Sequence, residues 1–158
     1  MTSVLDGLST EEAALVSEAD APRAAGAMKA VLTDRRFSDP AWVFERKLDG
    51  IRCISIRDGA SVRLLSRNDL SLNERYPELA RALEEESCTS FAVDGEVVAF
   101  DGAQTSFAAL AQRGRRPVKV FLYMFDLLWL GGHDVRRVPL LGRSGCSARR
   151  SSATTACA

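Results

Sequence analysis

One stretch of sequence decides the fold: IRCISIRDGASVRLLS, at residues 51–66. Two segments rich in β-branched and other apolar residues flank the pair Asp58-Gly59. An Asp-Gly pair between such segments is a strong signal for a β-hairpin, because both residues tolerate the backbone of a tight turn. We therefore predict a hairpin with strands at about 51–56 and 62–65.

Signals for regular structure continue beyond the hairpin. Helices are predicted at 74–86 and 106–113, and strands at 91–100 and 118–130. Pro77 suits the first turn of the earlier helix. The strand at 91–100 carries Asp-Gly-Glu in its middle, and a glycine inside a strand indicates a bulge or the close approach of a ligand. A further helix is expected to begin near Pro139.

The two ends of the chain differ from its middle. Ser9 and Glu12 have the spacing of a capping box, which predicts a helix to about Ala19. The last stretch, SGCSARRSSATTACA, shows no apolar periodicity and is predicted to be disordered. The predicted organisation is an N-terminal helix and linker at 1–27, a main domain at 28–143 and a tail at 144–158.

Composition indicates one soluble globular domain. The chain has 158 residues, of which 46% are hydrophobic and 27% charged. No apolar run approaches the eighteen or so residues of a membrane-spanning helix, and the start lacks a signal sequence. A cytoplasmic protein without membrane contact is therefore expected. The cysteines have no metal-ligand spacing and are expected to be free thiols: Cys53, Cys88, Cys146 and Cys157.

The net charge of the chain does not indicate a binding partner. The formal net charge is zero, whereas nucleic-acid-binding proteins often have an overall basic balance. Basic residues do cluster at 113–119 and 136–150. Such clusters are more often solvated surfaces than binding sites, so composition alone assigns them no role.

Lys47 is the first candidate for chemistry. It precedes Asp49 in a Lys-x-Asp-Gly pattern, with Arg46 and Arg52 nearby. Neighbouring cations, and desolvation by apolar residues such as those at 42–44, can lower the pKa of a lysine and free its amine as a nucleophile. Asp49 could orient that amine. Taken alone, the tetrapeptide favours a solvated loop lysine.

Other candidates are also ambiguous one by one. Asp94 and Glu96 lie two apart on a predicted strand, so both should point to one face, as ligands of a hydroxyl, cation or metal or as members of a salt bridge. Arg67 could bind phosphate or ribose oxygens, or be an ordinary surface arginine. Phe125 could stack on a planar base or belong to the core.

The order and spacing of these motifs carry more information than each motif alone. They are Lys-x-Asp-Gly-x-Arg at 47–52, Ser-Arg-Asn at 66–68, Asp-Gly-Glu at 94–96 and Tyr-x-Phe-Asp-Leu-Leu at 123–128. With them, the chain from about Met28 to Arg143 resembles the adenylation (nucleotidyltransferase) domain of ATP-dependent DNA ligases of the bacterial end-joining type. The resemblance implies an α+β, ATP-grasp-like nucleotidyltransferase fold of mainly antiparallel sheets flanked by helices.

The resemblance also implies roles for individual residues. Lys47 would attack the α-phosphate of ATP and hold AMP as a phosphoramidate. The implied nucleotide-binding residues are Glu45, Arg46, Arg52, Arg67, Glu96 and Phe125, supported by Asp49 and Asp94. Glu96 is also the candidate ligand for Mg²⁺ or Mn²⁺. The implied partner is nicked or broken double-stranded DNA, together with other end-joining repair proteins, in the cytoplasm at the nucleoid.

The sequence departs from the family pattern after Arg143. The later Glu-Gly and Lys-x-Lys motifs and the OB-fold are absent from the 158 residues. We therefore expect a truncated ligase with little or no sealing activity, exposed sheet edges and poor solubility, and a tail that could result from a frameshift. Two alternatives remain open: an RNA ligase or capping-type nucleotidyltransferase, and a remnant that binds ATP or DNA without catalysis.

Overall fold

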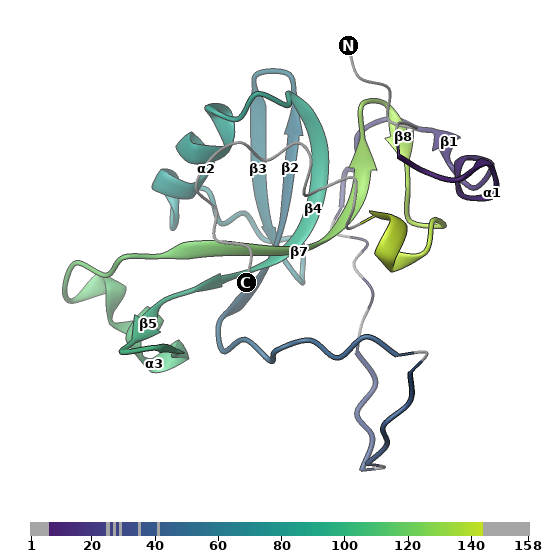
Figure 1. Cartoon of the computed structure of the whole chain (residues 1–158). Helices are drawn as coiled ribbons and strands as arrows, with labels where there is room; N and C mark the ends of the chain where they lie inside the picture. Colours follow the sequence, from purple (N-terminus) through teal and green to yellow (C-terminus); the bar gives the residue numbers. More distant parts are fainter. Residues whose placement is uncertain are drawn as a thin grey trace.

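The protein is an antiparallel sheet with helices packed at its faces and ends (Figure 1). The computed structural model describes residues 7–24, 26, 28, 30–34, 36–40 and 42–143. The elements in chain order are α1 (Thr10–Ala13), β1 (Ser17–Glu18), β2 (Ile51–Asp58), β3 (Ser61–Ser66), α2 (Pro77–Glu84), β4 (Ser90–Val98), β5 (Phe100–Asp101), β6 (Gln104–Thr105), α3 (Phe107–Ala111), the 3₁₀ helix η1 (Gln112–Gly114), β7 (Phe121–Leu130) and β8 (His133–Asp134). The tail predicted to be disordered, at 144–158, lies outside the described residues.

The main sheet has six strands in the order β1-β8-β7-β4-β2-β3, and every neighbouring pair is antiparallel. The predicted hairpin is confirmed as β2 and β3, which pair from Cys53–Ser66 to Asp58–Ser61. Gly59 has a φ of 61°, the left-handed conformation that the Asp-Gly signal requires. The mixed helix and antiparallel-strand class expected from the resemblance is also confirmed.

Helix α2 covers one face of the sheet. It buries Leu79, Ala80 and Leu83 against a core that includes Cys53 and Val97 of the central strands. Burial raises the pKa of the Cys53 thiol to about 11, which keeps the thiol protonated. Cys53 and Cys88 are free, as predicted; Cys146 and Cys157 lie outside the described residues.

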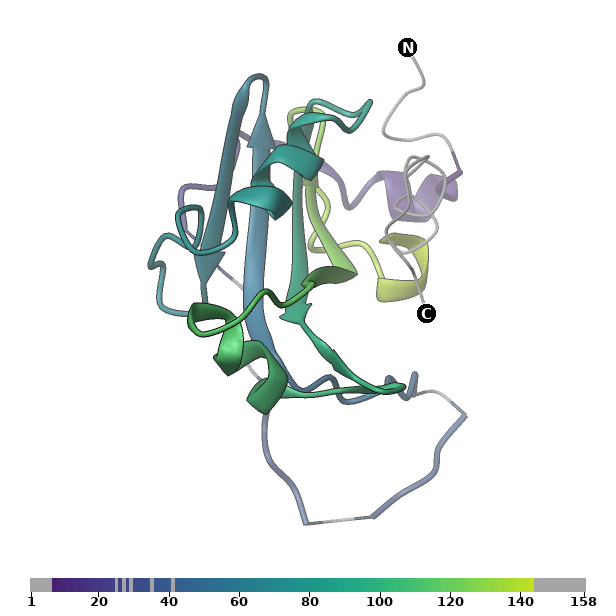
Figure 2. The same ribbon diagram turned by 90° about the vertical axis from the view of Figure 1, so that its left-hand side faces the viewer.

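The opposite face is covered by the N-terminal segment. Residues 17–23, here called the N-terminal strap, begin as β1 beside β8. Trp129 of β7 donates from Nε1 to the Ala19 carbonyl at 2.7 Å, and Arg63 of β3 donates to the Pro22 carbonyl at 2.7 Å. The strap therefore crosses the sheet and buries a second apolar cluster, and Figure 2 shows it behind the sheet with α2 in front.

The helix predicted near the N-terminus is shorter than expected, because the strap begins as a strand. The capping box of Ser9 and Glu12 is present, but α1 ends at Ala13 rather than near Ala19. Ser17 and Glu18 instead pair with β8. Pairing with a strand more than a hundred residues away overrides the local helix signal. The domain boundary predicted at residue 28 stays a prediction, although β1 belongs to the main sheet.

The remaining predicted elements are present with shorter bounds. Helix α2 begins at Pro77, α3 ends at Ala111, and β7 begins at Phe121. The strand predicted at 91–100 divides into β4 and β5, and residues 140–143 are helical, as expected near Pro139. None of the described helices is long and apolar enough to cross a membrane.

Candidate functional site

The candidate residues gather on the sheet face that α2 leaves uncovered. On β4, Val93 and Val97 belong to the core under α2, so the alternating Asp94 and Glu96 point to the other face. The shared face predicted for these two carboxylates is therefore present. The central strands position both side chains, while the strap covers only the far part of this face.

Phe125 reaches the same face through a bulge in β7. Asp94 pairs with Asp126 and the next residue, Gly95, pairs with Met124, so Phe125 has no partner on β4. An unpaired extra residue bends a strand and re-aims its side chain. A Cβ at Gly95 would lie 2.5 Å from the Tyr123 carbonyl oxygen, so the bulge also requires a glycine there.

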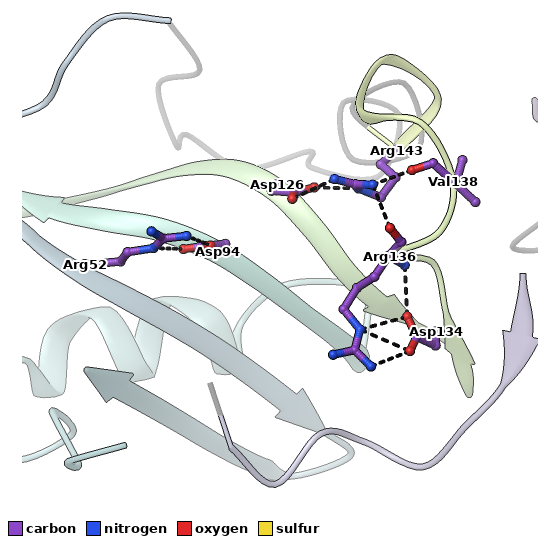
Figure 3. Close-up of polar contacts among 7 residues, drawn as sticks. All are labelled: Arg52, Asp94, Asp126, Asp134, Arg136, Val138 and Arg143. Carbon is purple, nitrogen blue, oxygen red and sulfur yellow. Dashed lines mark hydrogen bonds and ion pairs between the residues drawn. The ribbon is translucent and has the colours of Figure 1, made fainter. Parts of the chain in front are cut away.

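Arg52 and Asp94 form an ion pair across β2 and β4. The Nε of Arg52 donates to Oδ1 of Asp94 at 2.9 Å, and a second guanidinium nitrogen contacts Oδ2 (Figure 3). This hydrogen bond raises the pKa of Arg52 against the opposing effect of burial. The guanidinium carbon lies 5.9 Å from the centroid of the Phe125 ring. Arg52 is thus held at a fixed place beside the aromatic ring.

Glu96 connects β4 to the loop that carries Lys47, here called the lysine loop (residues 45–50). The Gly50 N–H donates to Oε1 of Glu96 at 2.9 Å. Burial raises the pKa of Glu96, while this hydrogen bond and the charges of Lys47 and Arg52 oppose the rise. The hydrogen bond from Gly50 therefore brings the two motifs, far apart in sequence, together at this place.

Gly50 is required by packing rather than by a turn conformation. A Cβ at this position would lie 2.2 Å from the Val97 carbonyl oxygen, a distance that no side chain can occupy. The Asp49-Gly50 pair, interpreted from sequence as a turn, is therefore the place where the lysine loop passes against β4.

Lys47 and Asp49 have different surroundings. Lys47 is exposed, and the described residues do not provide the apolar environment expected for it, since Trp42 and Phe44 are 61% and 63% exposed. The Asp49 carboxylate accepts the Phe107 N–H at 2.9 Å and so anchors the loop to α3. A role of Asp49 in orienting Lys47 stays a prediction.

Three predicted site residues lie at the edge of this arrangement. Glu45 and Arg46 are exposed in the lysine loop. Arg67 is exposed in the turn after β3, and because Ser66 pairs with Cys53, Arg67 follows at the end of the sheet where Arg52 lies. The structure brings their backbones near the site without a side-chain contact to it among the described residues.

A second acid–arginine pair was not predicted from sequence. Arg143 donates to Asp126 of β7 through Nε at 2.7 Å and Nη2 at 2.8 Å, and to the Arg136 and Val138 carbonyls (Figure 3). Asp126 is the register partner of Asp94, so two such pairs lie side by side on this face. The only sequence signal was the Asp in the Tyr-x-Phe-Asp motif.

The carboxylates present fit a magnesium ion only together with a phosphate ligand. Among the described residues no three His, Cys, Asp or Glu side chains form a metal-binding group. Asp94 is engaged by Arg52, which leaves Glu96 as the available carboxylate. Mg²⁺ is commonly bound by one or two carboxylates with substrate phosphates and water, so Glu96 is an adequate protein ligand.

Comparison with known families identifies the family of the chain. The family model for the ATP dependent DNA ligase domain matches residues 22–146. The chain therefore belongs to the ATP-dependent DNA ligase domain family, which confirms the resemblance inferred from its four motifs.

Particular relatives place the chain among bacterial end-joining and other DNA ligases. It is 37% identical over 92 residues to the multifunctional non-homologous end joining DNA repair protein LigD of Mycobacterium tuberculosis, covering 58% of this chain and 12% of that protein. It is 38% identical over 120 residues to a probable DNA ligase of Streptomyces avermitilis, covering 69% of this chain and 23% of the relative. The chain thus spans about an eighth to a quarter of the length of these curated relatives.

Solved structures show the same fold. The ligase domain of M. tuberculosis LigD matches with a TM-score of 0.61 and 32% identity, over 66% of this chain and 35% of that one. A mycobacterial DNA ligase D complexed with ATP and MES matches with a TM-score of 0.53 and 29% identity, over 70% and 38%. The common fold includes an antiparallel sheet like that described above.

Proposed function

We propose that this chain carries the nucleophilic lysine of an ATP-dependent DNA ligase and forms a lysyl-AMP intermediate at Lys47. In this reaction Lys47 Nζ forms a bond to the α-phosphorus of ATP and loses a proton. The bond from that phosphorus to the bridging oxygen breaks, and pyrophosphate leaves. The product is a phosphoramidate that holds AMP on the chain.

The observation that carries this proposal is the hydrogen bond from Gly50 to Glu96. It ties the lysine loop to the strand that bears the carboxylates, so that the loop carrying Lys47 lies against Glu96. Nucleotidyl transfer depends mainly on positioning and charge stabilisation, and this contact supplies the positioning.

The remaining residues fit the parts of a nucleotide. Phe125 offers a ring on which adenine would stack, and Glu96 would accept a ribose hydroxyl. Arg52 and Arg67 would contact the ribose or phosphates. Glu45 and Arg46, in the lysine loop, would border the adenine pocket. Asp94 supports Arg52 through the ion pair described above.

Magnesium fits the proposal through Glu96. When bound, it would neutralise charge on the phosphates and favour the departure of pyrophosphate. Manganese would serve in the same way.

The later steps concern DNA. AMP would pass from Lys47 to the 5′-phosphate at a break, and the 3′-hydroxyl would then displace AMP and seal the strand. Nicked or broken duplex DNA is therefore the proposed partner, with other end-joining proteins, in the bacterial cytoplasm at the nucleoid. The relatives named above are DNA ligases, which favours this substrate over RNA or a cap.

The proposal is tested by incubating the chain with α-labelled ATP and magnesium. We expect a labelled band that is lost in Lys47→Ala and retained in Lys119→Ala, which removes another exposed lysine. ATP binding without label in the wild-type chain would contradict the proposal and support a non-catalytic nucleotide-binding module.

A further inference from the structure

A cluster of cations lies outside the site described so far. Residues 113–119, Arg-Gly-Arg-Arg-Pro-Val-Lys, run from the end of η1 toward β7 and are here called the basic turn. Arg115, Arg116 and Lys119 are exposed. The turn lies at the outer tip of the molecule, at the opposite end from β8 (Figure 1).

Arg113 holds the basic turn in place. Its Nε donates to the Arg75 carbonyl at 3.0 Å, and its Nη1 donates to the Val118 carbonyl at 3.4 Å. Its Nη2 donates to Glu78 of α2 at 2.7 Å, and its guanidinium lies 5.3 Å from the Tyr76 ring centroid. The backbone that presents the exposed cations is therefore anchored to α2.

The exposed cations have no acidic partner within the described part of the chain. Glu78, which lies beside the turn, is already paired with Arg113. The side chains of Arg115 and Arg116 make no hydrogen bond or ion pair there, and Lys119 lies 5.0 Å from the Phe121 ring centroid. The turn thus presents uncompensated positive charge to solvent.

The basic turn is linked to the lysine loop by α3. Asp49 binds the N-terminus of α3 through the Phe107 N–H. From there α3 and η1 contain five and three residues, a path of about 14 Å. The start of the turn therefore lies within about four base pairs of B-DNA of the residue that Asp49 binds.

We infer that the basic turn binds the phosphate backbone of duplex DNA on one side of the break, through Arg115 and Arg116 with Lys119. The inference rests on the proposed function and assigns a surface to its DNA substrate. Guanidinium groups donate in a planar fork that matches phosphate oxygens. The turn itself exposes no large apolar side chain, whereas binding to a membrane surface normally uses apolar anchors.

The test compares two neutralising variants of the whole chain. Arg115→Gln with Arg116→Gln changes the basic turn. The control, Arg23→Gln with Arg137→Gln, removes the same charge from exposed positions in the strap and after β8. Fluorescence anisotropy with a labelled nicked duplex gives affinity at several salt concentrations, and thermal unfolding shows that both variants fold.

We expect the turn variant to bind DNA roughly tenfold more weakly at low salt. The slope of log affinity against log salt should fall by about 1.8, since each phosphate contact contributes about 0.9. The control variant should match the wild-type chain. The inference would be overturned if the turn variant bound the nicked duplex as tightly as the wild-type chain, or if the control variant lost as much affinity as the turn variant. It would also be overturned if the turn variant lost binding only to vesicles of anionic lipid and not to DNA.

The outcome is separable from that of the proposed function. Lysyl-AMP formation should be unchanged in the turn variant, because neither arginine contacts the site. If the chain forms no lysyl-AMP but the turn variant still binds DNA more weakly, the role of Lys47 is contradicted and DNA binding by the basic turn is supported. Normal labelling with no DNA effect would contradict only the surface.

Discussion

At the residue scale, the meeting of the lysine loop and β4 depends on Gly50. Alanine there would place its Cβ 2.2 Å from the Val97 carbonyl oxygen. We expect Gly50→Ala to lower the free energy of unfolding by about 2–3 kcal/mol, because the loop must move away and lose the bond to Glu96. Urea unfolding measures this change.

Gly114→Ala is the matched control, because a Cβ at Gly114 meets no atom within 4 Å. It should change the free energy of unfolding by no more than about 0.5 kcal/mol. Similar losses in both variants would show that Gly50 is not a point of close approach.

Asp94 is the second residue whose role can be measured. Its side chain is 3% exposed and carries the ion pair to Arg52, which is 28% exposed. Asp94→Asn should cost about 2 kcal/mol of unfolding free energy, since it leaves a partly buried cation without its partner. Asp134→Asn breaks the pair with the half-exposed Arg136 and should cost less than about 1 kcal/mol in the same urea experiment. The reverse order of the two costs would contradict this account.

Glu96 should make stability depend on pH. Burial raises its pKa above the ordinary 4.5, so the folded chain binds this proton more tightly than the unfolded chain. Its contribution to stability is therefore fully present below about pH 4.5 and lost as the pH rises through the raised value. As the pH rises through that value, the unfolding free energy of Glu96→Gln, measured with urea, should increase relative to that of the wild-type chain. Exposed Glu84→Gln serves as the reference for loss of one charge; a pH-independent difference for Glu96→Gln would be the contradicting result.

At the element scale, Arg57 of β2 fixes the end of α2. Its guanidinium donates to the carbonyls of Leu83 at 2.8 Å, Glu86 at 2.6 Å and Cys88 at 3.2 Å. Arg57→Met should lower unfolding free energy by about 3 kcal/mol and speed amide exchange in α2 more than in β2. Arg81→Met, on the exposed side of α2, should have little effect. Uniform exchange changes throughout the sheet would contradict a local role for Arg57.

The elements show what local sequence can and cannot predict. The β2–β3 hairpin was predictable because its Asp58-Gly59 turn and its apolar pattern agree. Helix α1 was predicted too long, because the pairing of β1 with distant β8 decides where it ends. The Asp-Gly pair in the lysine loop was interpreted as a turn because the approach of β4 is a tertiary contact.

The candidate site was predictable only where it depends on a local sequence pattern and not on tertiary contacts. Alternation on β4 placed Asp94 and Glu96 on one face from sequence alone. The bulge at Phe125 and the Arg143–Asp126 pair depend on strand register and on a chain that returns to β7 after β8. Neither leaves a periodic signal in the sequence.

At the scale of the whole molecule, the N-terminal strap closes the second apolar cluster. Deletion of residues 1–23 should expose Trp129, which is 5% exposed in the intact chain. In a Trp42→Phe background Trp129 is the single tryptophan, and its fluorescence should shift to longer wavelength on deletion. Deletion of residues 1–8 alone, which keeps the strap, should leave the emission unchanged. An unshifted spectrum after the longer deletion would show that the strap does not cover this face.

The central claim is that Lys47 accepts AMP, and peptide mapping by mass spectrometry tests it most directly. The chain is incubated with ATP and magnesium, digested and analysed for an acid-labile AMP adduct. We predict the adduct on the peptide that contains Lys47, and no adduct in Lys47→Arg, which keeps the positive charge. An adduct on another residue, or none on a folded chain that binds ATP, would contradict the account.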